Sequence, residues 1–324
     1  MIQKRRHHFV PKAYLTAFCN EAGRVFVYRK DGDGKPLPMV PDATQHQRDY
    51  YSQPKPEGDV DYNTLEDFFC GFEGDWPPLV KRLEGREDVS DSLESLFNFM
   101  ALQRARVPAY RDVIELTLAA TVKDLAKQMY EAGQLPPLPE GCENLLEEME
   151  VSIDPHQSIH AMAVIIEGMG KIVDSVGWVV FHNKTSTPFL TSDNPVAWFD
   201  PSVPFSQQKP YTFNPGGPLM VQFPISPKLL LFGTTEYRER FVSQGLIHAD
   251  IDSDEWVDCV NAQVCRFGYE AVISSTDSQG DLIAEFSGVS PVHTAQSVIL
   301  NGAAALFHSM EFGRRCKKPK WKDS

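Results

Sequence analysis

Residues 178–181 read Trp178-Val179-Val180-Phe181, a short run of branched and aromatic residues that is typical of a β-strand. Three similar runs follow, bounded by Pro, Gly or Asn: Phe189-Leu190-Thr191, Leu219-Met220-Val221-Gln222-Phe223 and Leu229-Leu230-Leu231-Phe232. No long helical pattern separates them, so antiparallel pairing is the simpler arrangement. This part of the chain decides the fold, because it predicts a mostly antiparallel sheet in the C-terminal half.

A helical region precedes this sheet, since apolar residues recur there at helical spacing. The expected helices begin near Tyr62 and run through 90–106, 110–132 and 156–176, with a break or restart at Trp76-Pro77-Pro78. After the sheet we expect a helix over 254–268, a strand over 271–274 and a last helix or mixed segment over 295–307.

The N-terminal part combines a short helix with a hairpin. Pro11 suits the start of a helix that reaches Phe18. Residues 24–29 alternate as a strand, and Asp31-Gly32-Asp33-Gly34 predicts a turn towards a partner strand at Met39. Residues 52–62 are expected to form a loop. The whole predicts an α+β protein with a helical central region. We expect one domain over 1–275, onto which the N-terminal segment folds back, and a C-terminal extension with a basic tail over 276–324.

Composition limits the classes of function. The net charge of the 324 residues is -13, which disfavours a general nucleic-acid coat protein, although basic residues gather at both ends of the chain. The six cysteines are scattered without a C-x-x-C pair, and no signal peptide or membrane-spanning run is visible. We therefore expect a cytoplasmic protein with no membrane association.

The candidate site begins with the paired imidazoles of Arg5-Arg6-His7-His8-Phe9-Val10-Pro11. One histidine of the pair could bind a divalent metal ion or transfer protons, while Arg6 neutralises phosphate charge. The alternative is that one imidazole anchors the N-terminus by hydrogen bonds and the other is exposed. In an extended strand the two would face opposite ways.

Three further segments carry polar groups that could join this site. Gln103 and Arg106 lie three residues apart on one helix face and could hold a carboxylate or phosphate, or simply bond the end of their own helix. Glu66 and Glu73 also share a helix face, and either could be a surface carboxylate. Asp193 and Asn194, before Pro195, could offer oxygen ligands or a general base, or form an ordinary Asx turn.

These motifs together resemble those of the DUF4238 family. The resemblance rests on Arg6-His7-His8-Phe9-Val10-Pro11-Lys12-Ala13-Tyr14-Leu15, Asp49-Tyr50-Tyr51, Glu73, Gln103-x-x-Arg106 and Thr191-Ser192-Asp193-Asn194-Pro195-Val196. It implies a widespread soluble family of uncharacterised function. It also implies that His7, His8, Gln103, Arg106, Asp193 and Asn194 recur as a group.

Two functions follow as hypotheses. The first is a metal-dependent hydrolase, such as a nuclease or phosphodiesterase. Its catalytic residues would be His7, His8, Asp193, Gln103 and Arg106, and Arg6, Asn194 and Glu73 would bind a nucleic-acid or other phosphate-containing substrate. The second is a non-catalytic protein that binds a protein partner in a stress or phage-defence system. There the same polar residues form a structural network. The hypotheses differ on whether these residues meet in an open pocket.

Overall fold

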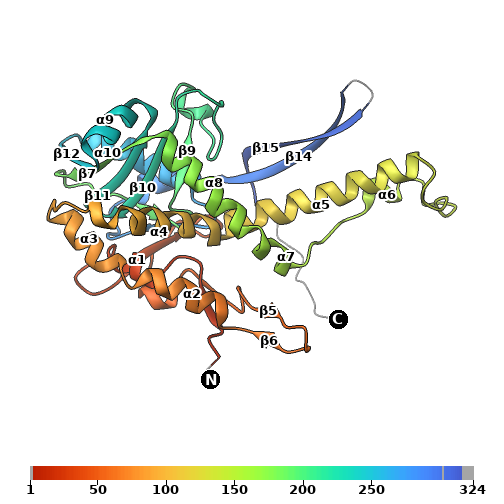
Figure 1. The fold of residues 1–324 in the computed structure, drawn as a ribbon, viewed down its shortest axis with the longest axis horizontal. Coiled ribbons are helices and arrows are strands. Elements are labelled where there is room, and N and C mark those ends of the chain that lie inside the picture. Colours follow the sequence, from red (N-terminus) through yellow and green to blue (C-terminus); the bar gives the residue numbers. More distant parts are fainter. Residues whose placement is uncertain (1–2, 301–302, 316–324) are drawn as a thin grey trace.

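The largest sheet has five strands in the order β12-β7-β11-β10-β9 (Figure 1). The strands are β7 (Gly177–Asn183), β9 (Ala197–Phe199), β10 (Met220–Ser226), β11 (Leu229–Thr234) and β12 (Ile247–Ile251). Strands β7, β11, β10 and β9 pair antiparallel, and only β12 joins β7 in parallel. The computed structural model describes residues 3–300 and 303–315. It confirms the α+β class and the mostly antiparallel pairing.

This sheet is covered on both faces, which explains why its central strands are apolar throughout. Successive side chains of β7 alternate between two clusters. Trp178 and Val180 join the main core with residues of α4 and α8, while Val179 packs with Val257 and Val260 of α10. The sheet therefore lies between α10 on one side and the helical central region on the other.

A smaller sheet joins the N-terminal hairpin to two short strands from later in the chain. Its order is β3-β2-β13-β8. The strands are β2 (Val25–Arg29), β3 (Leu37–Met39), β8 (Thr191–Ser192) and β13 (Ala271–Ser274). There are also two short pairs, β1 (Arg6–His8) with β4 (His46–Arg48), and β5 (Gln53–Pro54) with β6 (Val60–Asp61). The predicted return of 271–274 to a sheet is confirmed, but it pairs with the N-terminal hairpin rather than with the five strands.

The helices of the described residues surround these sheets. In the first half they are α1 (Lys12–Thr16), α2 (Thr64–Glu73), α3 (Trp76–Glu84), α4 (Leu93–Arg106) and α5 (Pro108–Glu131). The others are α6 (Leu145–Glu148), α7 (Pro155–His160), α8 (Met162–Ser175), α9 (Arg238–Gln244), α10 (Asp254–Phe267) and α11 (Gly280–Phe286). Helix α4 is central, because every residue from Phe99 to Arg106 is buried.

Two elements leave the body on the same side (Figure 1). One is the distal part of α5 with α6, and the other is a long hairpin of β14 (Ser290–Leu300) and β15 (Ala303–Gly313). The expectation of a helix or mixed segment over 295–307 was wrong, because residues 295–300 lie in β14 and residues 303–307 in β15. The boundary expected at residue 275 stays a prediction, and the basic residues after Arg315 lie outside the described part.

Two other local expectations were also wrong. The helix expected over 156–176 is divided at Ala161 into α7 and α8. The loop expected over 52–62 contains the short pair β5–β6. Both differences are local and leave the layers unchanged.

Candidate functional site

Strand pairing separates the two imidazoles of the N-terminal motif. Strand β1 pairs with β4 so that His7 lies opposite Gln47 and His8 opposite His46. Because neighbouring side chains of a strand face opposite ways, His7 points inward and is 0% exposed, while His8 is half-buried. The pair therefore cannot act together on one ligand.

Both ring nitrogens of His7 are used by the main chain. Tyr51 donates its N–H to Nδ1 at 2.7 Å, so the proton of the neutral ring lies on Nε2. Nε2 then donates to the carbonyl oxygens of Lys4, at 2.6 Å, and Tyr62, at 3.0 Å. The ring also stacks on that of Tyr51, with centroids 5.6 Å apart. This arrangement fixes the N-terminus to the 50–62 segment and leaves no nitrogen lone pair for a metal.

His8 lies in a more open and more charged place. Its Nε2 is 3.3 Å from the carbonyl oxygen of Asp42, and its ring meets the edge of His46 at 5.4 Å. Burial, helped by the nearby His46 ring, lowers the pKa of His8. Arg6 forms an exposed ion pair with Asp42 at 3.1 Å. Arg6 and His8 thus share one partly open surface.

The carbonyl oxygen of Phe9 brings the next residues together. Gln103 Nε2 donates to it at 3.1 Å and Arg106 Nε at 3.3 Å. Arg106 also forms an ion pair with Glu73 at 2.8 Å, and its guanidinium lies 5.0 Å from the centre of the Phe69 ring. The N-terminal segment, α2 and the end of α4 therefore meet, as the sequence grouped them.

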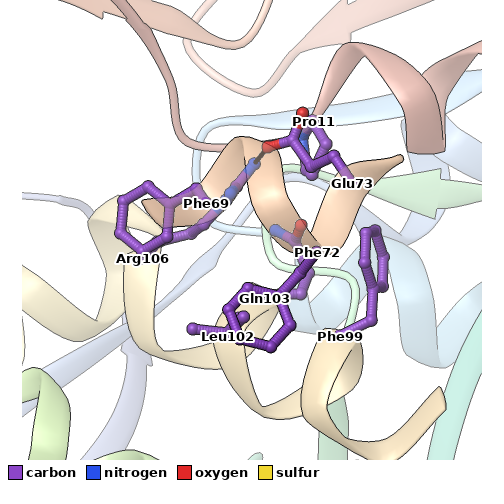
Figure 2. A pocket seen from close by; sticks show the side chains of 8 residues that line it. All are labelled: Pro11, Phe69, Phe72, Glu73, Phe99, Leu102, Gln103 and Arg106. Atoms are coloured by element: carbon purple, nitrogen blue, oxygen red, sulfur yellow. Dashed lines mark hydrogen bonds and ion pairs between the residues drawn. The ribbon is translucent and has the colours of Figure 1, made fainter. Parts of the chain in front are cut away.

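This meeting point is almost closed. It has about 170 Å³ of empty space between its side chains, none of it wide enough for a water molecule. The residues that line it are Pro11, Phe69, Phe72, Glu73, Phe99, Leu102, Gln103 and Arg106 (Figure 2). Within the described ranges, Gln103 Oε1 has no hydrogen-bond partner although it is buried. Nearby, burial raises the pKa of Glu66 to about 7, with Arg106 opposing the shift and Glu73 adding to it.

Asp193 and Asn194 form a second polar cluster with other partners. The two carboxylate oxygens of Asp193 accept the backbone N–H groups of Tyr269, at 2.8 Å, and Glu270, at 2.7 Å. Asn194 donates to the carbonyl oxygen of Phe267 at 2.9 Å and accepts from Tyr211 at 2.6 Å. These bonds tie the turn after β8 to the segment between α10 and β13.

Burial governs the electrostatics of this second cluster. Asp193 is 0% exposed, and burial, with the repulsion of Glu270, raises the pKa of its carboxyl. Lys30 lies near it and donates to the carbonyl oxygens of Cys265 and Gly268, at 2.8 and 2.7 Å, at the end of α10. Burial lowers the pKa of Lys30. Through these two hydrogen bonds, the Lys30 ammonium group caps the last carbonyl groups of α10.

The structure thus divides the predicted site into two clusters. Gln103, Arg106 and Glu73 gather around Phe9, whereas Asp193 and Asn194 bond to residues 267–271. His7 is connected to the first cluster through Tyr51, whose hydroxyl donates to the carbonyl oxygen of Arg106. Tyr14 links the two regions, because its hydroxyl meets Thr191 Oγ1 at 2.6 Å. Among the residues that the structure describes, no three histidine, cysteine or acidic side chains are placed to hold a metal ion.

Sequence reasoning passed over Arg104, which lies between Gln103 and Arg106. It is 4% exposed, and its guanidinium lies 3.6 Å from the centre of the Tyr211 ring, with Tyr110 and Trp198 also near. In the described part of the chain, neither its Nε nor its Nη1 meets a hydrogen-bond partner. Aromatic faces stabilise this buried cation in place of a carboxylate. Nothing in the local sequence distinguishes such an arginine from a surface one.

The sequence also gave no sign of a wide groove beneath α5. Its volume is about 1840 Å³, and it lies between α5, residues 149–156, the segment around Tyr50 and the base of the β14–β15 hairpin. Its basic side chains are Lys30, Arg111, Lys123, Arg314 and Arg315; its acidic ones are Asp31, Asp49, Asp112, Glu115, Glu150 and Glu270. These residues come from distant segments, so only the fold makes the groove visible.

Comparisons with known proteins add one finding. A family model described as "Protein of unknown function (DUF4238)" matches residues 6–278. No curated protein and no solved structure matches the chain. Over residues 3–300 and 303–315, no helix is both long and apolar enough to cross a bilayer.

Proposed function

The chain belongs to the DUF4238 family of unknown function, and we propose that it is a non-catalytic interaction protein. In this proposal the polar motif holds the fold together, and the groove beneath α5 binds a segment of a protein partner. One observation carries the proposal. His7 and Asp193 are both 0% exposed, and each bonds with both of its polar side-chain atoms to the main chain.

His7 and Asp193 are poorly suited to catalysis. A general base needs a free lone pair within reach of the substrate, and a metal ligand needs one aimed at the ion. The lone pair of His7 Nδ1 accepts from Tyr51, and the carboxylate of Asp193 accepts from Tyr269 and Glu270. Opening either site would break main-chain hydrogen bonds.

The groove has features that fit a polypeptide better than a small molecule or a nucleic acid. Its volume of about 1840 Å³ exceeds the roughly 300–1,000 Å³ of ordinary small-molecule pockets. Its basic and acidic side chains are mixed rather than of one sign. A nucleic acid would require a predominantly basic surface. A protein segment that carries both signs of charge would find complementary partners here.

A groove-filling substitution tests this proposal. Ala120 lines the groove on α5, so Ala120→Arg would place a long charged side chain in it. We expect cross-linking in lysate of the source cells to capture a defined partner with the wild type and to lose it with Ala120→Arg. Val242→Arg is the matched control, because Val242 is 80% exposed on α9 and does not line the groove. Equal capture by all three proteins would refute the groove as the binding site.

A second candidate is a hydrolase that acts on a phosphodiester or nucleic-acid substrate. The observation that favours it is Glu66, whose pKa of about 7 suits a general acid or base, close to the charge of Arg106. Half-buried His8 and exposed Arg6 would bind substrate, with Gln103 and Glu73 in supporting positions. The divalent metal ion that the sequence suggested on Asp193 is not part of this candidate, because Asp193 belongs to the other polar cluster and both of its carboxylate oxygens accept main-chain N–H groups.

A panel of nucleotides and nucleic acids, assayed with Mg²⁺, Mn²⁺ or Zn²⁺, tests the hydrolase candidate. Turnover that disappears in Glu66→Gln while the fold is kept would support it and count against the interaction protein. Absence of turnover in the wild type across the panel would refute the hydrolase candidate.

The interaction proposal extends to compartment and pathway. We propose a cytoplasmic component of a stress or phage-defence system. The five cysteines among the described residues, Cys19, Cys70, Cys142, Cys259 and Cys265, are free thiols, which suits a reducing compartment. Deleting the gene and challenging the cells with phage tests the defence role. Unchanged plaque formation would count against it.

A further inference from the structure

Helix α5 carries a second apolar face that the fold leaves uncovered. Leu118, Val122 and Leu125 are 38%, 47% and 53% exposed, and half-buried Met129 continues the same row. The four residues are spaced by four, three and four positions. This is the spacing of successive core positions in a coiled coil, where apolar residues of one helix pack against those of another. The distal part of α5 thus carries an apolar row of the kind that packs against a second helix. We call this row of four residues the seam.

This seam lies away from the groove. Beyond Glu115, the groove is lined on α5 by Leu116, Ala119, Ala120 and Lys123. With 3.6 residues per turn, Leu116, Ala120 and Lys123 lie on the side of the helix opposite to the row of Leu118, Val122 and Leu125, and Ala119 lies between the two faces. The seam therefore requires an occupant of its own, whatever the groove binds.

We propose that the occupant is a second copy of this chain, whose own α5 packs antiparallel against the seam across a two-fold axis. In such a contact the same patch serves both partners, so it must be complementary to itself. The positions beside the seam are the uncharged Ala119, Thr121, Ala126 and Gln128. Two chains with a net charge of -13 each can approach there without opposing like charges, and the alanines let the helices come close.

The lack of charge at the seam also distinguishes a second copy from other occupants. A nucleic acid would need basic residues along the row. A charged protein partner would need side chains of the opposite sign to specify it. The seam offers apolar side chains and small neutral neighbours, which a copy of itself matches fully.

The accessible surface leaves room for such an interface. The chain exposes 17213 Å², whereas a compact protein of its mass, 36.4 kDa, exposes about 13,500 Å². A stable homodimer buries on the order of 1,000–2,500 Å² from each partner. The excess surface is larger than this, and α5 and the β14–β15 hairpin project from the body of the molecule (Figure 1).

Sedimentation velocity of the full chain across a hundredfold range of concentration tests the proposal. We expect the wild type to shift from the 36.4 kDa chain to twice that mass as concentration rises. Leu125→Lys should raise the dissociation constant by at least about tenfold, because it places two like charges at the seam. Val242→Lys, at an apolar residue on α9 that is even more exposed than Leu125, should leave the dissociation constant unchanged.

The other outcomes each contradict the proposal. A wild-type monomer at every concentration means that the seam does not bind a second copy; flotation with phosphatidylcholine vesicles would then show whether it binds a lipid surface. A dimer that Leu125→Lys leaves intact has its interface elsewhere. Circular dichroism confirms that each variant keeps the helical content of the wild type, so a change in mass is not a loss of fold. Ala120→Arg changes the opposite face of α5, so loss of partner capture and loss of the dimer can be told apart.

Discussion

The N-terminal motif and the distal part of α5 differ in which side chains they bury and which they expose. Around the motif, polar groups such as His7 and Asp193 are fully buried and bonded to the main chain. Along α5, apolar groups such as Leu118 and Leu125 are exposed, and the groove lies on the other face. The residues of a family motif can therefore be those that fix the fold. A binding surface can consist of residues that no motif marks.

The largest expected effect is on the second polar cluster. Asp193→Ala leaves the buried N–H groups of Tyr269 and Glu270 without an acceptor. Each such group costs about 1–3 kcal/mol, so we expect a loss of roughly 3 kcal/mol in the free energy of unfolding. Urea denaturation measures it. Asp281→Ala, at an exposed aspartate on α11, is the control and should change less than about 0.5 kcal/mol. A loss below about 1 kcal/mol for Asp193→Ala would contradict a structural role.

The two neighbouring histidines provide the next comparison. His7→Ala removes three hydrogen bonds to the main chain and the stacking on Tyr51, so we expect a loss of about 2–3 kcal/mol. His8→Ala removes one long contact with the carbonyl of Asp42 and should cost less than about 1 kcal/mol. Thermal unfolding of both variants side by side measures the difference. Equal losses would mean that the pair is not divided into an inner and an outer residue.

The sequence predicted best those elements whose patterns lie within one short segment of the chain. Helix α4 and strands β2 and β7 were visible because their patterns are local. The β14–β15 hairpin was missed although the sequence places Asn301-Gly302, a favoured hairpin dipeptide, between its strands. The window over 295–307 included the end of one strand and the start of the next, so two alternating strands looked like one mixed segment.

The sequence identified the polar residues of the site, but only some of the groups to which they bond. The motif grouped His7, Gln103 and Arg106; the last two meet at the carbonyl oxygen of Phe9, and His7 is connected to them through Tyr51. It also grouped Asp193, whose partners are amide groups more than seventy residues away. Sequence shows which side chains can bond, whereas the choice between a ligand and a distant backbone amide is made by tertiary packing.

A pH-dependent effect of intermediate size is expected at Glu66. Its folded pKa of about 7 lies above the ordinary value of 4.5. The stability that this group contributes is therefore complete below pH 4.5 and is lost as the pH rises through 7. Because the side chain is only partly buried, Glu66→Gln should raise the free energy of unfolding by about 1–2 kcal/mol at pH 8. At pH 4.5 it should have almost no effect.

Denaturation at both pH values measures this difference. Glu73→Gln is an informative second variant, because the negative charge of Glu73 helps to raise the pKa of Glu66. We expect the pKa of Glu66 to fall in that variant when followed by NMR. A stability gain from Glu66→Gln that is the same at pH 4.5 and pH 8 would show that the carboxyl does not titrate near 7.

The smallest effect is expected on the groove face of α5. Ala120→Arg replaces one strong helix former by another at a position beside open space, so we expect a change within about 0.5 kcal/mol in the free energy of unfolding. For a chain of this size that corresponds to a shift of roughly 1–2 °C in Tm. A loss of several degrees would mean that this face of α5 is packed like the motif region. The N-terminal motif and the distal part of α5 would then not differ in packing, because both regions would be parts of one core.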